Sequence, residues 1–202
     1  MVIIGVIAAL TVPTLMNKTN NQEFVAKLKK TYSTFAQATN LIISNEGLPK
    51  DNWATSDEAV YQQYKKYLNN VKECAGGTGC MNQLTDTYRY KNLQGNNIST
   101  NWNKQTSNRR FIVGDGVQVM IYGSNAACSL SSNNWADNYC SLIWVDLNGE
   151  KKPNTFGRDV FMFALKGDGK LIPGGCDRKE DVCLTVNEKC ACKVIREGAM
   201  NY

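Results

Sequence analysis

The sequence predicts an α+β fold in which one long N-terminal helix packs on an antiparallel β-sheet. Three observations favour this class. Apolar residues recur at helical spacing up to residue 46. Short β-rich runs separated by turn dipeptides follow from about residue 84, and eight cysteines lie in the part of the chain that reads as loops and strands. Such a sheet needs a cover on one face, and the apolar face of the long helix can supply it.

The composition narrows the function before any motif is considered. At 202 residues, 43% hydrophobic and 20% charged, the chain has the size and balance of one globular domain, or of one domain with an appendage. It contains no histidine, which removes the commonest general base, the commonest metal ligand and every Ser/His or Cys/His nucleophilic pair. We therefore expect no enzyme. The net charge of +5 is small and spread along the chain, which argues only weakly for a nucleic-acid partner.

Residues 2–16 carry no charged side chain. As a helix they would span about 22 Å, less than the ~30 Å hydrocarbon core of a membrane. They also lack the basic start and the small-residue cleavage site of a secretory signal peptide. A buried core helix of a soluble protein is one interpretation. The other is close helix packing in lipid or in a filament, which the small residues Gly5, Ala8 and Ala9 favour.

The helical pattern continues beyond residue 18. Apolar positions recur at steps of three and four, which predicts one apolar helix face made of Phe24, Leu28, Tyr32, Phe35, Thr39 and Ile42. Gly47 and Pro49 end the pattern, so we expect one helix up to residue 46, bent at Pro13 where a backbone hydrogen bond is missing. A shorter helix is predicted over residues 55–70, with Thr55 and Glu58 at capping-box spacing.

The rest of the chain predicts strands joined by turns. Two strands are expected around residues 114–116, a third ends at residues 148–149, and another pair flanks residues 167–169. A last short strand is predicted at residues 192–195. The two Gly-Asp-Gly turns and the Pro-Gly-Gly of residues 173–175 lack the helix and the Lys-Ser/Thr of a phosphate-binding loop, so turns explain them better.

The cysteines predict disulfide bonds formed in an oxidising compartment. Two pairs bracket short segments and are expected to be local bridges: Cys74 with Cys80, and Cys128 with Cys140. The other four allow three pairings that the spacing does not distinguish: Cys176, Cys183, Cys190 and Cys192. A zinc site is the alternative, but the usual knuckle spacing and a histidine ligand are both missing.

Oxygen-bearing side chains alternate in the loop after the third strand. They are Asp146, Asn148, Glu150, Asn154 and Asp159. Such a glycine-containing loop suits a hard cation such as calcium, although the distal Glu and the third early ligand of an EF-hand are missing. The alternative is a tight hairpin turn at residues 148–149, with Asp159 beginning a strand.

The run IIGVIAALTVPTLMNKT, leading into an amphipathic helix and a cysteine-containing sheet, resembles the N-terminal segment of type IV pilins and type II secretion pseudopilins. The placement of Gly, Ala-Ala and Pro carries the likeness. The runs VDLNGEKKPNTFGRDVFMFALKGDGKLIPGG and CACKVIREGAMNY resemble the C-terminal half of a bacterial subgroup of these proteins. Residues 70–140 resemble no family in particular.

This resemblance implies a pilin-like fold. Residues 1–22 would be the half-helix that lies in the membrane and later in the filament core, and residues 23–202 the globular head. Within the head, residues 23–46 would be the amphipathic half-helix and residues 84–202 the antiparallel sheet with its loops. Pro13 would be the helix-bending proline of the family. Several pseudopilins hold calcium in the region that corresponds to the loop after Asp146.

The resemblance also implies a function and its partners. The protein would be a structural subunit of a type IV pilus or a type II secretion pseudopilus. It would be anchored in the bacterial inner membrane by its N-terminal helix, then polymerised through helix packing into a surface filament or a periplasmic pseudopilus. The implied partners are identical or related subunits, an inner-membrane assembly platform and a prepilin peptidase that acts on the full-length precursor.

Family members begin with a basic leader, a Gly at the cleavage point and a Glu shortly after it, and none of these precedes or follows Met1 here. We therefore expect about ten N-terminal residues to be missing, which would bring the apolar run to the roughly 17–25 residues that cross a membrane.

A binding module is the second hypothesis, in the form of a minor tip pilin or adhesin that recognises a surface ligand or DNA. It rests on the Asn-, Ser- and Trp-rich middle section. Trp102, Trp135 and Tyr139 lie there in polar connections, where they are either exposed contacts or packed beneath their own loops.

Overall fold

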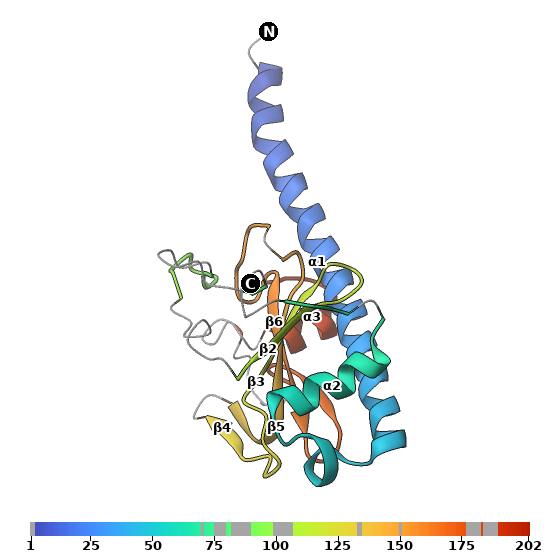
Figure 1. Cartoon of the computed structure of the whole chain (residues 1–202). Helices are drawn as coiled ribbons and strands as arrows, with labels where there is room; N and C mark the ends of the chain where they lie inside the picture. The colour runs from blue at the N-terminus through green and yellow to red at the C-terminus, as the bar shows by residue number, and fades with distance from the viewer. Residues whose placement is uncertain are drawn as a thin grey trace.

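The computed structural model describes residues 3–69, 71–74, 80–81, 90–98, 107–132, 135–149, 151–176, 183 and 190–202, with the backbone alone for 3–18, 131–132 and 135–137. Its dominant element is α1 (Ile3–Glu46), a helix of 44 residues. Figure 1 shows α1 running along the head and then extending beyond it, with a gradual curve. The predicted helix is confirmed, and its backbone stays helical through Pro13.

A short π-helical turn, η1 (Pro49–Trp53), follows α1 and leads into α2 (Asp57–Tyr67). The predicted second helix is confirmed, but its predicted capping box is wrong. Ser56 is the N-cap, and its Oγ accepts a hydrogen bond from the Ala59 amide at 3.1 Å. Glu58 is thereby placed at the second helical position, where it pairs with Arg109 and accepts from Gln62 instead of closing a box.

The sheet is antiparallel and seven-stranded, in the order β1-β2-β3-β5-β6-β7, with β4 paired to β5 off this path. Its strands are β1 (Lys72–Glu73), β2 (Arg109–Ile112), β3 (Gln118–Tyr122), β4 (Leu130–Ser132), β5 (Trp135–Asp146), β6 (Val160–Lys166) and β7 (Leu171–Pro173). The strands predicted around the three turns are confirmed. The short strands β1 and β4 were not predicted, because their polar sequences carry no strand pattern.

The last predicted strand is wrong, because residues 192–195 belong to the helix α3 (Ala191–Glu197). Ala191 and Val194, three residues apart, are both buried in the core that includes α1. Gly198 ends the helix in the left-handed conformation at φ 67° and donates its amide to the Val194 carbonyl. Four residues are too few to distinguish the period of a strand from that of a helix.

Both faces of the sheet are buried, where the sequence predicts a cover on only one. One face packs on α1, α2 and α3 through alternate strand residues such as Val119, Ile143 and Phe163. The other face forms a second core, made largely of Met81, Tyr90, Met120, Tyr139, Leu142, Trp144, Phe156 and Met162. Burial on both faces explains why β5 and β6 read as continuous apolar runs instead of alternating ones.

Candidate functional site: the seat of the N-terminal helix

Only the C-terminal half of α1 is seated on the head. Among the side chains that the structure describes, Val25 is the first buried residue of α1. Leu28, Phe35 and Ile42 continue the same buried face, each without exposed surface. The predicted apolar face is therefore confirmed as the helix surface that covers the sheet. The N-terminal half extends away from the head (Figure 1).

Aromatic contacts and one hydrogen bond fix this half of the helix on the sheet. The Tyr32 ring lies 5.4 Å from the Phe163 ring in an edge-on arrangement. The Tyr32 hydroxyl donates to the Leu171 carbonyl at 3.0 Å. Because β7 is the edge strand of the sheet, α1 satisfies a carbonyl there that would otherwise be open to pairing with another chain.

A buried hydroxyl pair joins α1 to α2. The hydroxyls of Thr39 and Tyr64 lie 2.7 Å apart, and Thr39 also donates to the Phe35 carbonyl at 2.7 Å. Burial raises the pKa of Tyr64 well above its ordinary value, so the phenol is neutral. The pair favours one register of α1 against α2, because a shift would leave the buried Tyr64 hydroxyl without this partner, while Thr39 would keep its bond to Phe35.

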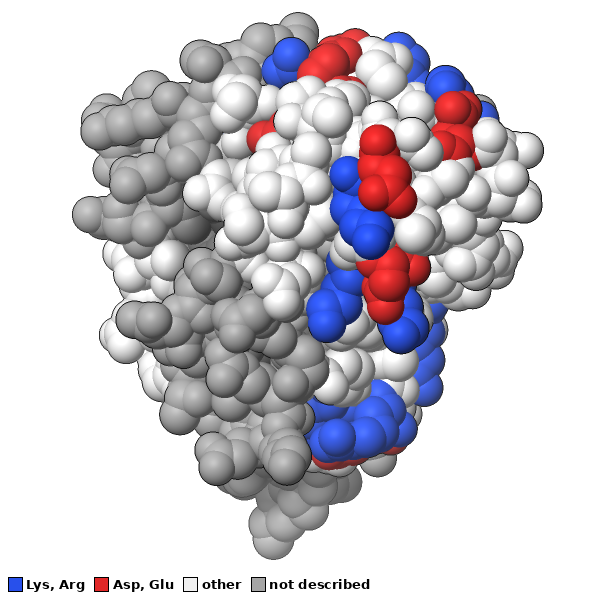
Figure 2. All heavy atoms as spheres, turned by 90° about the horizontal axis from the view of Figure 1, so that it is seen from below, with Lys and Arg blue, Asp and Glu red and all other residues white. Residues whose placement is uncertain are grey.

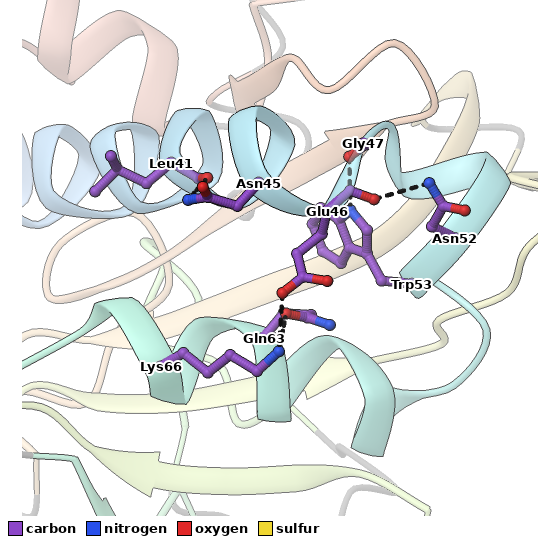
Figure 3. A network of polar contacts seen from close by, with 8 residues as sticks. All are labelled: Leu41, Asn45, Glu46, Gly47, Asn52, Trp53, Gln63 and Lys66. Atoms are coloured by element: carbon purple, nitrogen blue, oxygen red, sulfur yellow. Dashed lines mark hydrogen bonds and ion pairs between the residues drawn. The ribbon is translucent and has the colours of Figure 1, made fainter.

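The C-terminal end of α1 is capped by the turn that follows it (Figure 3). The Asn52 side chain donates to the Glu46 carbonyl at 2.8 Å, and the Trp53 indole donates to the Gly47 carbonyl at 3.0 Å. Lys66 of α2 pairs with the Glu46 carboxylate at 3.0 Å. The Asn52 side chain thereby satisfies a carbonyl that the helix end leaves free, and the Trp53 indole satisfies the next carbonyl along the chain. The sequence signals the helix stop through Gly47, but not the capping role of η1.

The structure brings four of the five predicted calcium ligands together at the β5–β6 connection. Asp146 and Asp159 are fully buried, and the Leu147 amide donates to the Asp159 carbonyl at 2.8 Å. Asn148 and Asn154 lie between them in the same loop. Glu150 lies outside the described residues.

Backbone amides donate hydrogen bonds to the carboxylates of Asp146 and Asp159. Asp146 Oδ1 accepts from the amides of Asn148 and Gly149 at 3.3 and 2.8 Å, and Tyr90 donates to its Oδ2 at 3.3 Å. The Asp159 oxygens accept from the amides of Asn154 and Thr155 at 2.8 and 2.6 Å. Burial is the largest influence on Asp159 and raises its pKa to about 6.

The loop agrees with the hairpin-turn alternative only locally. Asp146 accepts from the amides of a turn at residues 148–149 and Asp159 directly precedes β6, but β5 ends at Asp146 and β6 begins at Val160, so the connection is not a tight hairpin. With its NH2 group facing inward, the Asn154 side chain donates to the carbonyls of Gly149 and Lys151 at 3.1 and 3.2 Å. In the part of the chain that the structure describes, no group of three or more His, Cys, Asp or Glu side chains could hold a metal ion. Calcium binding by this loop stays a prediction.

All eight cysteines form disulfides, so none is free. The two predicted local bridges, Cys74–Cys80 and Cys128–Cys140, are confirmed. Of the three pairings left open for the last four cysteines, the structure has the nested one: Cys176–Cys192 outside and Cys183–Cys190 inside. The zinc alternative fails because every sulfur is paired. The nested bridges hold the start of α3 against the end of β7.

Tyr139, one of the three aromatics in polar connections, is 3% exposed and belongs to the second core. Trp102 and the side chain of Trp135 lie outside the described residues. Sequence reasoning also missed Met81, Tyr90 and Phe156 of that core, because isolated apolar residues in irregular segments show no period.

Neither a membrane-spanning helix in the described part of the chain nor a known relative identifies the site. Among the residues that the structure describes, no helix is both long enough and apolar enough to cross a membrane. Comparisons with protein-family models, with curated proteins and with solved structures found no match. The fold defines an α+β protein with a disulfide-bonded head and a helix that extends beyond it.

Proposed function

We propose that the protein is a structural subunit of a type IV pilus or a type II secretion pseudopilus. The observation that carries this proposal is the division of α1 into a seated half and an extended half. At 1.5 Å per residue the helix is about 66 Å long, of which residues 25–46 cover only about 33 Å of head. Residues 2–16 are uncharged, and an apolar helix of this length in water requires a partner.

Copies of the same helix are the partner that the sequence of this segment suits best. Gly5, Ala8 and Ala9 present little side-chain volume, which lets helix backbones approach closely. The contacts between α1 and the head support this role, because the cap, the hydroxyl pair and the edge-strand contact give the head one fixed orientation on its helix. Subunits can repeat regularly along a polymer only if each head has the same orientation on its helix. Before assembly, lipid would cover the same segment. The further partners would be related subunits, an assembly platform and a processing peptidase.

Assembly of the purified full chain tests the proposal. The protein is purified in mild detergent, the detergent is removed, and filaments are sought by electron microscopy and by sedimentation. We expect pelletable filaments from the wild type. The variant Ala9→Glu should form none, because assembly would bury an unpaired charge. The matched control Thr55→Glu, at an exposed position just before α2, should assemble normally. Equal assembly of Ala9→Glu, or a wild type that stays monomeric, would contradict the proposal.

The binding-module hypothesis is weaker, because Tyr139 is buried and cannot contact a ligand. It stays a prediction for the segments that the structure does not describe.

Calcium would add rigidity to the β5–β6 loop if it binds there. We expect calcium at about 100-fold excess over its dissociation constant to stabilise the protein by ~2.7 kcal/mol. In a chain of this size that raises the melting temperature by about 5–10 °C. The measurement is thermal unfolding with calcium, with magnesium as the control, and with a chelator. An identical melting temperature in all three would remove calcium from the account.

A further inference from the structure

Four segments far apart in the sequence meet at the end of the head from which α1 emerges. Lys91 forms a β-bridge with Thr155, and its amide donates to the Asn154 carbonyl at 3.0 Å. The Tyr202 hydroxyl donates to the Gly157 carbonyl. These contacts join residues 90–98, the β5–β6 loop and the C-terminal segment.

The C-terminal segment in turn touches α1. The Lys29 amine lies beside Gly198 at the end of α3, only 3.2 Å from where a Cβ on that glycine would lie. Figure 1 shows the β5–β6 loop, in orange, and the C-terminus at the end of the head from which the N-terminal half of α1 projects. Surface residues of these segments therefore surround the same end of the molecule.

This end of the head, which we name the basic end, carries an excess of exposed cations. Arg158 is half-buried and the other cations are exposed. The members of the basic end are Lys29, Lys91, Lys151, Lys152, Arg158 and Arg196.

Few acids oppose these cations among the described residues of the same segments. Asp159 is buried and faces backbone amides, while Glu197 lies 3.5 Å from Arg196 and offsets it. Glu23 is exposed on α1, and Asp115 of the β2–β3 turn pairs with Lys30 at 2.6 Å, so Lys30 is not counted among the members of the basic end.

The opposite end of the head has a different charge pattern. Figure 2 views the molecule from that end and shows acidic and basic side chains side by side over the described surface. The C-terminus of α1 lies there, and Glu46 pairs with Lys66 at 3.0 Å. Glu58 pairs with Arg109 on the neighbouring α2. Among the residues that the structure describes, the cation excess therefore lies at the basic end, while charges of both signs are paired at the opposite end.

We propose that the basic end binds the anionic headgroups of a phospholipid bilayer. The inference rests on the proposed function, because a helix half held in lipid brings this end of the head against the membrane surface. Ammonium and guanidinium groups form charge-assisted hydrogen bonds with phosphate. Each basic side chain near an anionic surface strengthens partitioning about fivefold, over a range of about one Debye length. A bilayer also accommodates the apolar helix that emerges beside these cations, whereas a nucleic acid does not.

Vesicle binding by the full chain tests this proposal. Vesicles of phosphatidylcholine alone are compared with vesicles that also contain phosphatidylglycerol, at low and at physiological salt. We expect the wild type to prefer the anionic vesicles, and salt to weaken that preference. The variant Lys151→Gln/Lys152→Gln should bind anionic vesicles about tenfold more weakly or worse. The control Lys50→Gln/Lys65→Gln changes two exposed lysines of η1 and α2, removes the same charge and should bind like the wild type.

The outcomes separate this proposal from the proposed function. Binding to neutral vesicles and filament formation report on the helix, and both should be the same in the two charge variants. Equal binding of the wild type to neutral and anionic vesicles would overturn the basic end as a lipid surface while leaving assembly intact. Equal losses of binding to anionic vesicles in the two charge variants would also overturn the basic end as a lipid surface. A salt-sensitive preference for duplex DNA without any preference among vesicles would identify a nucleic acid as the ligand instead.

Discussion

Asp159 combines full burial with two backbone hydrogen bonds, and these act on its pKa in opposite directions. Burial disfavours the charged carboxylate and raises the pKa, while the amides of Asn154 and Thr155 lower it; burial dominates, and the pKa rises to about 6. The folded state therefore binds this proton more tightly than the unfolded state does. The stability it contributes is fully present below the unfolded pKa, near 4, and is lost as pH rises to about 6.

Acid should consequently stabilise the protein in this window. From this carboxyl alone we expect the free energy of unfolding to fall by about 1–3 kcal/mol between pH ~4 and pH ~7. No imidazole titrates there, because the chain has no histidine. Urea unfolding in the presence of a chelator measures the effect as the difference between the wild type and Asp159→Asn.

The control for this titration is Asp168→Asn. Asp168 is exposed and its pKa is lowered, so the stability it contributes is present above pH ~4 and is lost only in more acidic solution. Removing it should therefore leave the pH dependence between pH ~4 and pH ~7 unchanged. A difference between the wild type and Asp159→Asn that does not vary with pH would contradict the assignment.

The hydroxyl pair of Thr39 and Tyr64 should contribute measurably to the free energy of unfolding. Thr39→Val leaves the buried Tyr64 hydroxyl unpaired and should cost about 1–3 kcal/mol of unfolding free energy. Thr34→Val alters an exposed threonine of the same helix that bonds only its own turn, and should cost under ~0.5 kcal/mol. Adding Tyr64→Phe to Thr39→Val should recover part of the loss. Equal effects of the two threonine variants would show that the pair is unimportant.

Among the elements, α1 has two surfaces of opposite character. Leu28 has no exposed surface, whereas Leu41 is 51% exposed on the same helix. Leu28→Ala should cost about 2–5 kcal/mol, because it leaves a cavity against the sheet. Leu41→Ala should change stability by under ~0.5 kcal/mol. Chemical denaturation of both variants gives the comparison, and similar costs would mean that the helix is not seated as described.

The elements that sequence reasoning predicted are those with long, consistent patterns. The repeat of apolar residues from Phe24 to Ile42, ended by Gly47, leaves little choice but a helix, and the Gly-Asp-Gly turns locate two hairpins. α3 was assigned as a strand because four residues carry no resolvable period. The turn near Asp146 was ambiguous, because carboxylates that accept backbone amides and carboxylates that ligate a cation have the same sequence pattern. The second core draws on Met81, Tyr90 and Ile98, which are isolated apolar residues in segments without a periodic pattern.

For the whole molecule, the described core contacts involve the C-terminal half of α1 and not its N-terminal half. The head folds around the C-terminal half of α1 and around four disulfides, with both faces of its sheet buried. The described contacts of the core begin at Phe24 and Val25. The extended half therefore contributes little to the stability of the head, and in this account it serves assembly.

Removal of the extended half tests this claim most directly. Sedimentation of the full chain is compared with that of residues 23–202, at matched concentration and without detergent, together with the melting temperature of each. We expect the full chain to associate, and the shortened chain to be monomeric with a melting temperature within a few degrees of the full chain's. A shortened chain that associates as strongly as the full chain, or a full chain that is monomeric under the same conditions, would contradict it.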